Sequence, residues 1–332
     1  MSVSIIIKTL NEAERIAATI ESALAGVGSD GEVIIADSGS SDATLAIAAR
    51  YPVTIVQLAP DQPPSCGIGP QLGYQYSRGE FVCLLDGDML LDPHFLPQGI
   101  AFLNTNPGVA GVSGHVVEMN LSSLEFARRV ARGGVEYSVG TVDRLNGGGL
   151  YRRSAIDTIG YLSDRNLHGM EEFDLGVRLR QQGWTLHRID IPYVQHFGYE
   201  MDAYALLLRR WRSKYLWGIG EILRAASGRS HATMVWREVR ELRLWAAVYL
   251  GLLAMVLALV LLPNKLMALL GCVAAVLVVI AVMSLRSRSL RMGLYSVTAW
   301  AFKIAALPMG YFRPRRDPAA WIDSHLVRRA DG

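Results

Sequence analysis

The chain has 332 residues, of which 51% are hydrophobic, and its formal net charge is +3. Residues 286–332 hold nine of the 33 basic side chains and three of the 30 acidic ones, so residues 1–285 carry a net charge of −3. This balance excludes nucleic acid as the obvious partner of the main domain, whereas the basic C-terminal segment suits the anionic cytoplasmic face of a membrane.

Strand and helix patterns alternate over the first hundred residues. A helix-period pattern follows the first strand at 10–26, with capping-box spacing at Thr9–Glu12 and Asn11–Glu14. The alternation predicts an α/β fold with a mostly parallel central sheet and helices on both faces. The apolar, β-branched runs that predict its strands are 3–9, 32–37, 53–58 and 80–88.

Polar side chains stand at the carboxyl ends of three of these strands, namely Thr9, Asp37 and Asp86. Ligands of such sheets bind beyond the carboxyl ends of the strands, so these ends predict a binding site. Further along, the patterns are looser. They predict a glycine-rich strand at 108–119, a helix at 122–139, a flexible loop at 146–153 and a helix beginning at Glu171.

Two uncharged runs near the C-terminus, 245–262 and 266–285, are each close to the ~20 apolar residues that cross a bilayer. Pro263, Asn264 and Lys265 separate them, which predicts a transmembrane helical hairpin; the alternative is a pair of buried core helices. Residues 203–222 combine Leu, Trp and Tyr with four basic residues, which favours a helix lying on the membrane over an ordinary surface helix.

The flanking charges and the N-terminus predict the orientation. Residues 1–7 enter a strand without a secretory signal, and Cys66, Cys83 and Cys272 lack metal-site spacing, so we expect reduced thiols and a cytoplasmic catalytic domain. The apolar stretch 292–312 contains Lys303 and Pro308, and we expect it to lie in the interface. Basic residues flank the two apolar runs, and positive-inside bias places both groups in the cytoplasm, which predicts a multi-pass protein of the cytoplasmic (inner) membrane. These residues are Arg237, Arg240, Arg243, Arg286, Arg288 and Arg291.

An acidic pair, Asp86 and Asp88, ends the apolar run that begins at Phe81. Mg²⁺ and Mn²⁺ prefer carboxylate and phosphate oxygens, so the pair suits an ion that also binds a diphosphate leaving group. Taken alone, an Asp-x-Asp is more often part of a turn.

The ordered motifs "IIIKTLNE", "IIADSGSSDAT", "RGEFVCLLDGDMLLDP", "GGGLYRRSAI" and "HGMEEFDLGVRLRQQGW" resemble the family 2 glycosyltransferases with the GT-A fold, over about residues 3–200. The resemblance implies that Asp86 lies near ribose and metal, that Asp88 is the metal ligand, and that Glu172 is the catalytic base. The residues that it places on the nucleotide are Thr9, Asn11, Glu12 and Asp37.

Other positions keep open alternatives. Glu171 and Asp174 are the other candidates for the base, although acidic residues in a first helical turn also compensate the helix dipole. Pro70-Gln71-Leu72-Gly73 replaces the family's Arg-Asn-x-Gly, which leaves Gln71 as the donor contact there. His196 either completes the metal or phosphate site or is a packed residue.

Two further motifs bear on the acceptor. Residues 146–149 either line the acceptor side or form a plain loop. Leu207 replaces the glutamine of the Gln-x-x-Arg-Trp motif found in processive members, so we expect one sugar to be added per encounter.

The expected function is inverting transfer of a sugar from a nucleotide-diphosphate sugar to a membrane, lipid-linked acceptor, with Mg²⁺ or Mn²⁺. The alternatives are a catalytically impaired membrane scaffold with this fold, or a nucleotidyltransferase, for which the glycine-rich phosphate loop is missing after residue 9. An oxidoreductase would need a G-x-G-x-x-G there. The expected regions are a catalytic domain at 1–200, interface helices at 201–243, two transmembrane helices at 244–286, and an interfacial helix with a basic cytoplasmic tail at 287–332.

Overall fold

The computed structural model describes residues 2–119, 138–198 and 201–330. The chain divides into two compact units, the first formed by Met1–Leu206 with Pro314–Gly332 and the second by Leu207–Arg313. The predicted helix at 122–139 lies outside the described residues, apart from its last two positions, which are not helical.

The first unit is built on a ten-stranded sheet, counted over the described residues, with the order β10-β3-β2-β1-β4-β8-β6-β9-β5 and with β7 paired to β9. The strands β3, β2, β1 and β4 run parallel, as the sequence predicts. The strand bounds are β1 Val3–Thr9, β2 Glu32–Asp37, β3 Thr54–Leu58, β4 Phe81–Asp86, β5 Met89–Leu91, β6 Val109–Glu118, β7 Gly140–Val142, β8 Gly149–Arg152, β9 Thr185–His196 and β10 Ser324–Arg328.

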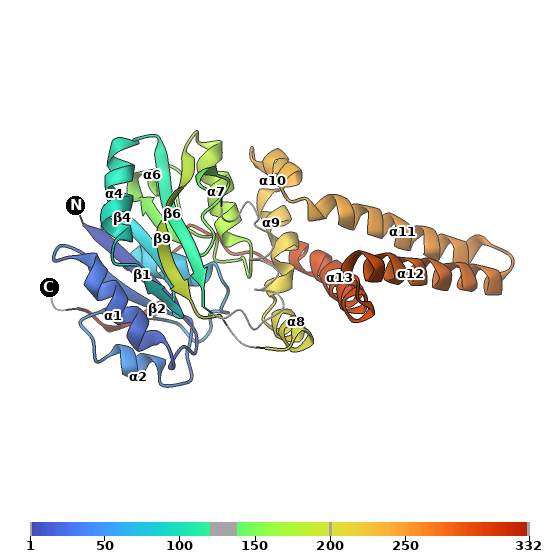
Figure 1. The fold of residues 1–332 in the computed structure, drawn as a ribbon, viewed down its shortest axis with the longest axis horizontal. Helices are drawn as coiled ribbons and strands as arrows, with labels where there is room; N and C mark the ends of the chain where they lie inside the picture. Colours follow the sequence, from blue (N-terminus) through green and yellow to red (C-terminus); the bar gives the residue numbers. More distant parts are fainter. Residues whose placement is uncertain (1, 120–137, 199–200, 331–332) are drawn as a thin grey trace. The chain divides into compact units, whose positions relative to one another are not determined.

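Side-chain alternation along the central strands gives the sheet two apolar faces. In β1, Ile5 and Ile7 join the core under α1 and α4, whereas Ile6 joins the core under α3, α6 and α7. Helices therefore cover both faces of the central strands, whose residues are mostly buried, and Figure 1 shows them on either side of the sheet. The helix bounds are α1 Ile16–Val27, α2 Thr44–Ala48, α3 Ile68–Tyr76, α4 Phe95–Thr105, α6 Arg153–Asp157 and α7 Glu171–Gln181.

The first helix begins later than its pattern predicts, at Ile16 instead of residue 10. Asn11 has a left-handed backbone with φ of 59°, and neither predicted capping box forms. The backbone N–H groups of residues 11–13 instead donate to side chains of the loop after β2 and of the first residue of α2 at 2.8–3.1 Å, namely Ser40, Thr44 and Asp42. These bonds join the two loops that follow β1 and β2. They fix the position of both loops at the carboxyl ends of the strands, which we call the carboxyl edge of the sheet.

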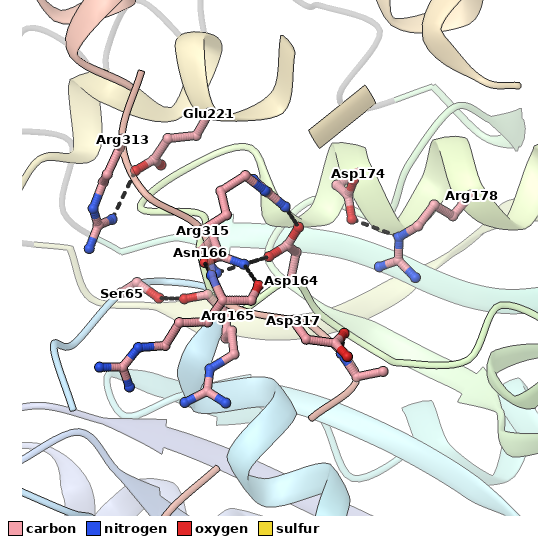
Figure 2. A network of polar contacts seen from close by, with 12 residues as sticks. Ser65, Asp164, Arg165, Asn166, Asp174, Arg178, Glu221, Arg313, Arg315 and Asp317 are labelled. Atoms are coloured by element: carbon pink, nitrogen blue, oxygen red, sulfur yellow. Dashed lines mark hydrogen bonds and ion pairs between the residues drawn. The ribbon is translucent and has the colours of Figure 1, made fainter. Parts of the chain in front are cut away.

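The C-terminal segment belongs to the first unit and is not a free basic tail. The strand β10 pairs antiparallel with β3 at the edge of the sheet. Arg315 forms an ion pair with the fully buried Asp164 (Figure 2). The Arg316 backbone exchanges hydrogen bonds with the Asn166 amide. Residues 314–330 therefore separate from 287–313, with which the sequence grouped them.

The second unit is helical. Its elements are η2 Tyr215–Trp217, α9 Gly218–Ala226, α10 Ala232–Glu238, α11 Glu241–Leu261, α12 Lys265–Ser287 and α13 Leu290–Tyr311, and α8 Ala203–Arg212 leads into it. The predicted helix at 203–222 is thus broken after residue 212, where Lys214 is left-handed with φ of 63°.

The helices α11 and α12 are the two in the described residues that are long and apolar enough to cross a membrane, with mean hydropathies of 2.5 and 3.0. Only 6% of the apolar window of each is buried, which argues against the alternative of two core helices. Asn264 caps α12 by accepting a hydrogen bond from the Met267 backbone N–H at 3.1 Å. The helix α13 lacks the apolarity of these two, although it has comparable length.

Candidate active site

The carboxyl ends of β1, β2 and β4 meet because β1 lies between the other two strands. Thr9 is in register with Asp37, and Lys8 with Asp86. Three of the predicted polar positions, Thr9, Asp37 and Asp86, therefore lie at the same end of neighbouring strands. The Thr9 hydroxyl donates to Asp37 Oδ1 at 3.1 Å.

Asp37 is completely buried and organises the loop that follows β2. Its Oδ2 accepts hydrogen bonds from the backbone N–H groups of Gly39 and Ser40 at 3.0 and 2.9 Å, and from Gln57 at 3.2 Å. Asn11 accepts from the Ser41 backbone at 2.8 Å. These contacts shape the loops at this edge, so any contact of these side chains with a nucleotide would be added to a structural role.

Gln71, the expected donor contact, is bonded within the fold. It is 6% exposed, and its side-chain oxygen accepts from the backbone N–H groups of Leu162 and Ser163 at 2.9 and 3.1 Å. Those bonds fasten α3 to the loop that precedes α7. The sequence pattern had no means of showing them, because the partners are about ninety residues away.

A cluster of three carboxylates and one ammonium group lies on the α3 and α7 side of the sheet. Lys8 Nζ is 2.9 Å from Asp86 Oδ1 and 3.7 Å from Glu171 Oε1. Burial alone would lower the pKa of Lys8, but the charges of Asp86, Glu171 and Glu172 raise it well above its usual value. Lys8 is therefore charged at any physiological pH.

Glu172 is held at the start of α7 by the glycine run that precedes β8. Its Oε1 accepts a hydrogen bond from the Gly148 backbone N–H at 3.1 Å. Burial and the charge of Glu171 raise the pKa of Glu172 to about 7, against the opposing effects of Lys8 and a backbone bond from Gly147. A carboxylate with a pKa near the working pH suits general acid–base chemistry.

The glycine run 147–149 has a defined backbone conformation and holds the Glu172 carboxylate, and we call it the glycine cradle. All three residues have positive φ, with values of 72°, 93° and 150°. A Cβ on Gly148 would lie 2.3 Å from the backbone oxygen of Leu84, so the loop passes too close to β4 for any side chain.

Replacing Gly148 should therefore damage both stability and the cradle. In Gly148→Ala the strained backbone alone costs about 1–3 kcal/mol, and relief of the clash must move the loop away from β4. We expect a clearly lower Tm and lower turnover, measured by thermal unfolding and by donor hydrolysis. Gly108→Ala is the matched control, since nothing lies within 4 Å of its added Cβ. Equal Tm values for the two variants would contradict the cradle.

Asp174, the remaining candidate for the base, points away from this cluster. Its Oδ2 lies 2.7 Å from Arg178 Nε, and both side chains are buried (Figure 2). Arg178 also donates to the backbone oxygens of Tyr161 and Leu162, at 2.7 and 2.9 Å. The pair secures α7 to the preceding loop, and we assign Asp174 a structural role.

The residue before α7 is strained. Met170 adopts a left-handed backbone, with φ of 71°, and the first turn of α7 follows at once. Such a conformation costs about 1–3 kcal/mol and persists where the surroundings impose it, often at functional sites. Here it directs Glu171 and Glu172 toward the carboxyl edge of the sheet.

Asp88, in the turn between β4 and β5, lies beside His196, the last residue of β9. His196 Nε2 is 3.5 Å from Asp88 Oδ2, and its Nδ1 is 2.7 Å from Glu118 Oε2. Burial lowers the pKa of His196, but hydrogen bonds to Asp88 and Glu118 outweigh it and raise the pKa to about 10. The histidine thus orients Asp88 from one side and is itself oriented by the buried Glu118.

The acidic pair fits a divalent cation that arrives with its substrate. Mg²⁺-type ions commonly take one or two protein carboxylates and complete their coordination with phosphates and water. Over the described ranges 2–119, 138–198 and 201–330, no group of three or more His, Cys, Asp and Glu side chains is arranged to hold a metal. Asp86 and Asp88 would therefore supply part of the coordination and a diphosphate the rest.

Sequence reasoning missed Lys8 and Glu118. A signal for Lys8 exists, because it is the one charged residue in the buried run "VSIIIKT" and its strand is expected to neighbour others. Such a residue needs an opposite charge nearby. Glu118 offered no signal, since its partner, His196, comes 78 residues later.

The α/β unit with an acidic cluster at its carboxyl edge has the GT-A architecture. Residues 4–160, just under half of the chain, match the model of glycosyl transferase family 2. The mannosyltransferase PcManGT of Pyrobaculum calidifontis, solved in complex with GDP-Man and Mn²⁺, shares the fold at 19% identity and a TM-score of 0.58, covering 93% of this chain and 87% of that one.

Two relatives are similar in sequence. Glucomannan 4-beta-mannosyltransferase 7 of Arabidopsis thaliana is 27% identical over 172 residues, which are 48% of this chain and 30% of that protein. The succinoglycan biosynthesis protein ExoO of Rhizobium meliloti (strain 1021) is 32% identical over 135 residues, 38% of each protein. The chain thus spans about a third of the length of these relatives.

Proposed function

We propose that this protein is a membrane-attached, inverting glycosyltransferase that moves a sugar from a nucleotide-diphosphate donor to a lipid-linked or membrane-proximal acceptor. The observation that carries the proposal is that a candidate metal-binding pair and a candidate base both lie at the carboxyl edge of the sheet. The Asp86–Asp88 pair ends β4, and Glu172, with its pKa raised to about 7, begins α7. A single displacement with one base inverts the anomeric centre.

Each acidic residue has a separate role in the proposed sugar transfer. Asp86 and Asp88 would hold Mg²⁺ or Mn²⁺ together with the donor, and the ion would stabilise charge on the departing diphosphate. Glu172 would remove the proton of the acceptor hydroxyl as the sugar's anomeric carbon is attacked. The GDP-Man and Mn²⁺ bound by the similar mannosyltransferase support a nucleotide sugar and a divalent ion here.

The apolar helices α11 and α12 support a membrane location, and with it an acceptor that is a lipid or lies at the membrane surface. Exposed aromatic side chains of the second unit, such as Tyr215 and Trp236, suit the interface between lipid and water. A function in polysaccharide, glycolipid or cell-envelope synthesis follows, in line with the succinoglycan protein ExoO.

The path of the chain constrains its membrane topology. The first unit contains residues that precede the second unit in the sequence and residues that follow it, and β10, which follows it, pairs with β3. A domain folded on one side of a membrane must have its chain leave and return on that side, so residues 207–313 must cross an even number of times. If α11 and α12 cross, α13 does not.

Topology reporters test this arrangement. A reporter that is active only outside the cytoplasm should be inactive when fused after residue 332, and active when inserted between Pro263 and Lys265, at the turn of the hairpin. Because residues 314–332 belong to the first unit, an active C-terminal fusion would place that unit outside the cytoplasm and would contradict the orientation we propose.

A panel of nucleotide sugars tests the reaction. The full-length protein in lipid nanodiscs should release nucleoside diphosphate from one member of the panel, and turnover should require Mn²⁺ or Mg²⁺. Release of pyrophosphate would indicate nucleotidyl transfer instead. If every member gave no product, with lipid extract supplied as acceptor, the protein would be a scaffold that retains the fold.

A further inference from the structure

Lys8 joins two parts of the proposed active site that come from distant regions of the sequence. It is in register with Asp86 across the β1–β4 pair, and its Nζ also approaches Glu171 on α7. Its side chain is 21% exposed, and that of Glu171 is 14% exposed. Both charges are therefore largely withdrawn from water, where an ion pair is strengthened and an unpaired charge is costly.

The packing leaves the lysine little freedom. The stem of Lys8 passes against α3, where a Cβ on Gly69 would come within 3.0 Å of the Lys8 Cβ. Along β1, Lys8 has the parity of Ile6, whose side chain enters the core under α3 and α7. The ammonium group is thus directed toward the start of α7 by the strand and by its neighbouring helix.

We infer that Lys8 is a positioning residue, whose ammonium group links Asp86 on the donor strand to Glu171 on the base helix and so sets the placement of Glu172. This inference rests on the proposed glycosyl transfer. The role follows from the charge balance: without Lys8, three carboxylates would converge at the site with no cation supplied by the cluster itself.

The groups that face Glu172 come from several elements. Glu171 neighbours it on α7, Lys8 lies on β1 and Asp86 ends β4. Tyr151 of β8 and Cys66, which precedes α3, also interact with it electrostatically, but burial raises the pKa of both and keeps them neutral. Among these groups of the described residues, Lys8 is the cation that opposes the negative charges.

Opposite pH shifts are expected when the two ends of the link are removed. In Lys8→Met, loss of the cation should raise the pKa seen on the low-pH side of the kcat profile, the acid limb, by about one pH unit. Turnover should also fall about 10–100-fold because the base helix is misplaced. In Glu171→Gln, loss of the like charge should move the limb down. Lys8→Arg should return the limb toward its original position, whatever its bulk does to turnover.

Thermal unfolding gives a readout that needs no substrate. Glu172 is neutral well below its pKa of about 7, so Lys8 opposes one more negative charge above that pH. The Tm deficit of Lys8→Met should therefore be larger above pH 7 than at pH 5. A lysine that only fills space would give a deficit independent of pH.

The outcomes separate the inference from the function on which it rests. If no nucleotide sugar turns over in the unaltered protein, the proposed function fails, and the Tm series alone decides the role of Lys8. If turnover occurs but the acid limb stays fixed in Lys8→Met and in Glu171→Gln, or if the Tm deficit does not change with pH, Lys8 is not the link.

Discussion

Glu172→Gln is expected to lower turnover about 10²–10⁴-fold, the usual contribution of a positioned acid or base. Glutamine keeps the size of the side chain, and its carbonyl oxygen can still accept the Gly148 N–H bond, so the fold should be unaffected. The variant loses only the ability to take a proton. Because that ability matters only in the transition state, kcat and kcat/KM should fall together while donor binding stays nearly normal.

Glu171→Gln is the matched control for this variant. Both residues lie in the first turn of α7, but Glu171 faces Lys8, whereas Glu172 is held by the glycine run. The loss of turnover in Glu171→Gln should stay within the roughly 10–100-fold range expected for loss of the Lys8 link, and below that of Glu172→Gln. A reversed pattern, with Glu171→Gln inactive and Glu172→Gln active, would exchange the roles of the two residues.

The pH profile of the unaltered protein gives an independent check on the base. The reaction needs Glu172 without its proton, and its pKa is about 7, so kcat should fall as the pH is lowered below 7. Glu172→Gln should retain only a low rate without this limb. A flat profile from pH 5 to 8 in the active protein would point to a different base.

The sequence alone predicts the parallel half of the sheet well, because local patterns determine it. Each of β1, β2 and β4 is a mostly apolar run that ends in a polar residue, and strand–helix alternation implies parallel pairing. The other half is not readable in this way. The three-residue strands β5 and β7 both pair with β9, which lies far along the chain, so no local pattern shows their partners.

The site shows the same division between local and distant contacts. The acidic residues are recognisable because each stands at a strand or helix end, where the fold class places a ligand. Their surroundings are not. Gln71 and Asp174 have plausible positions in the sequence, yet one binds the backbone of a distant loop and the other binds Arg178. Residue type and spacing identify candidates, and only the partners show which of them are free to act.

Asp88→Asn is expected to abolish metal-dependent turnover and to leave the fold intact. The carboxylate is the proposed ligand of the ion, and a neutral amide oxygen is a much weaker ligand for Mg²⁺ or Mn²⁺. The change keeps the side chain's volume and its capacity to bond His196, which lies 3.5 Å away, so Tm should change little.

The control for Asp88→Asn changes the other residue that contacts His196. Glu118→Gln alters the other partner of His196, at 2.7 Å, without touching the proposed ligand, and should lower turnover only modestly. Binding of Mn²⁺ in the presence of nucleoside diphosphate, followed by electron paramagnetic resonance, should be lost in Asp88→Asn and kept in Glu118→Gln. Full Mn²⁺-dependent turnover in Asp88→Asn would remove Asp88 from the mechanism, since no rearrangement of an amide restores the missing charge.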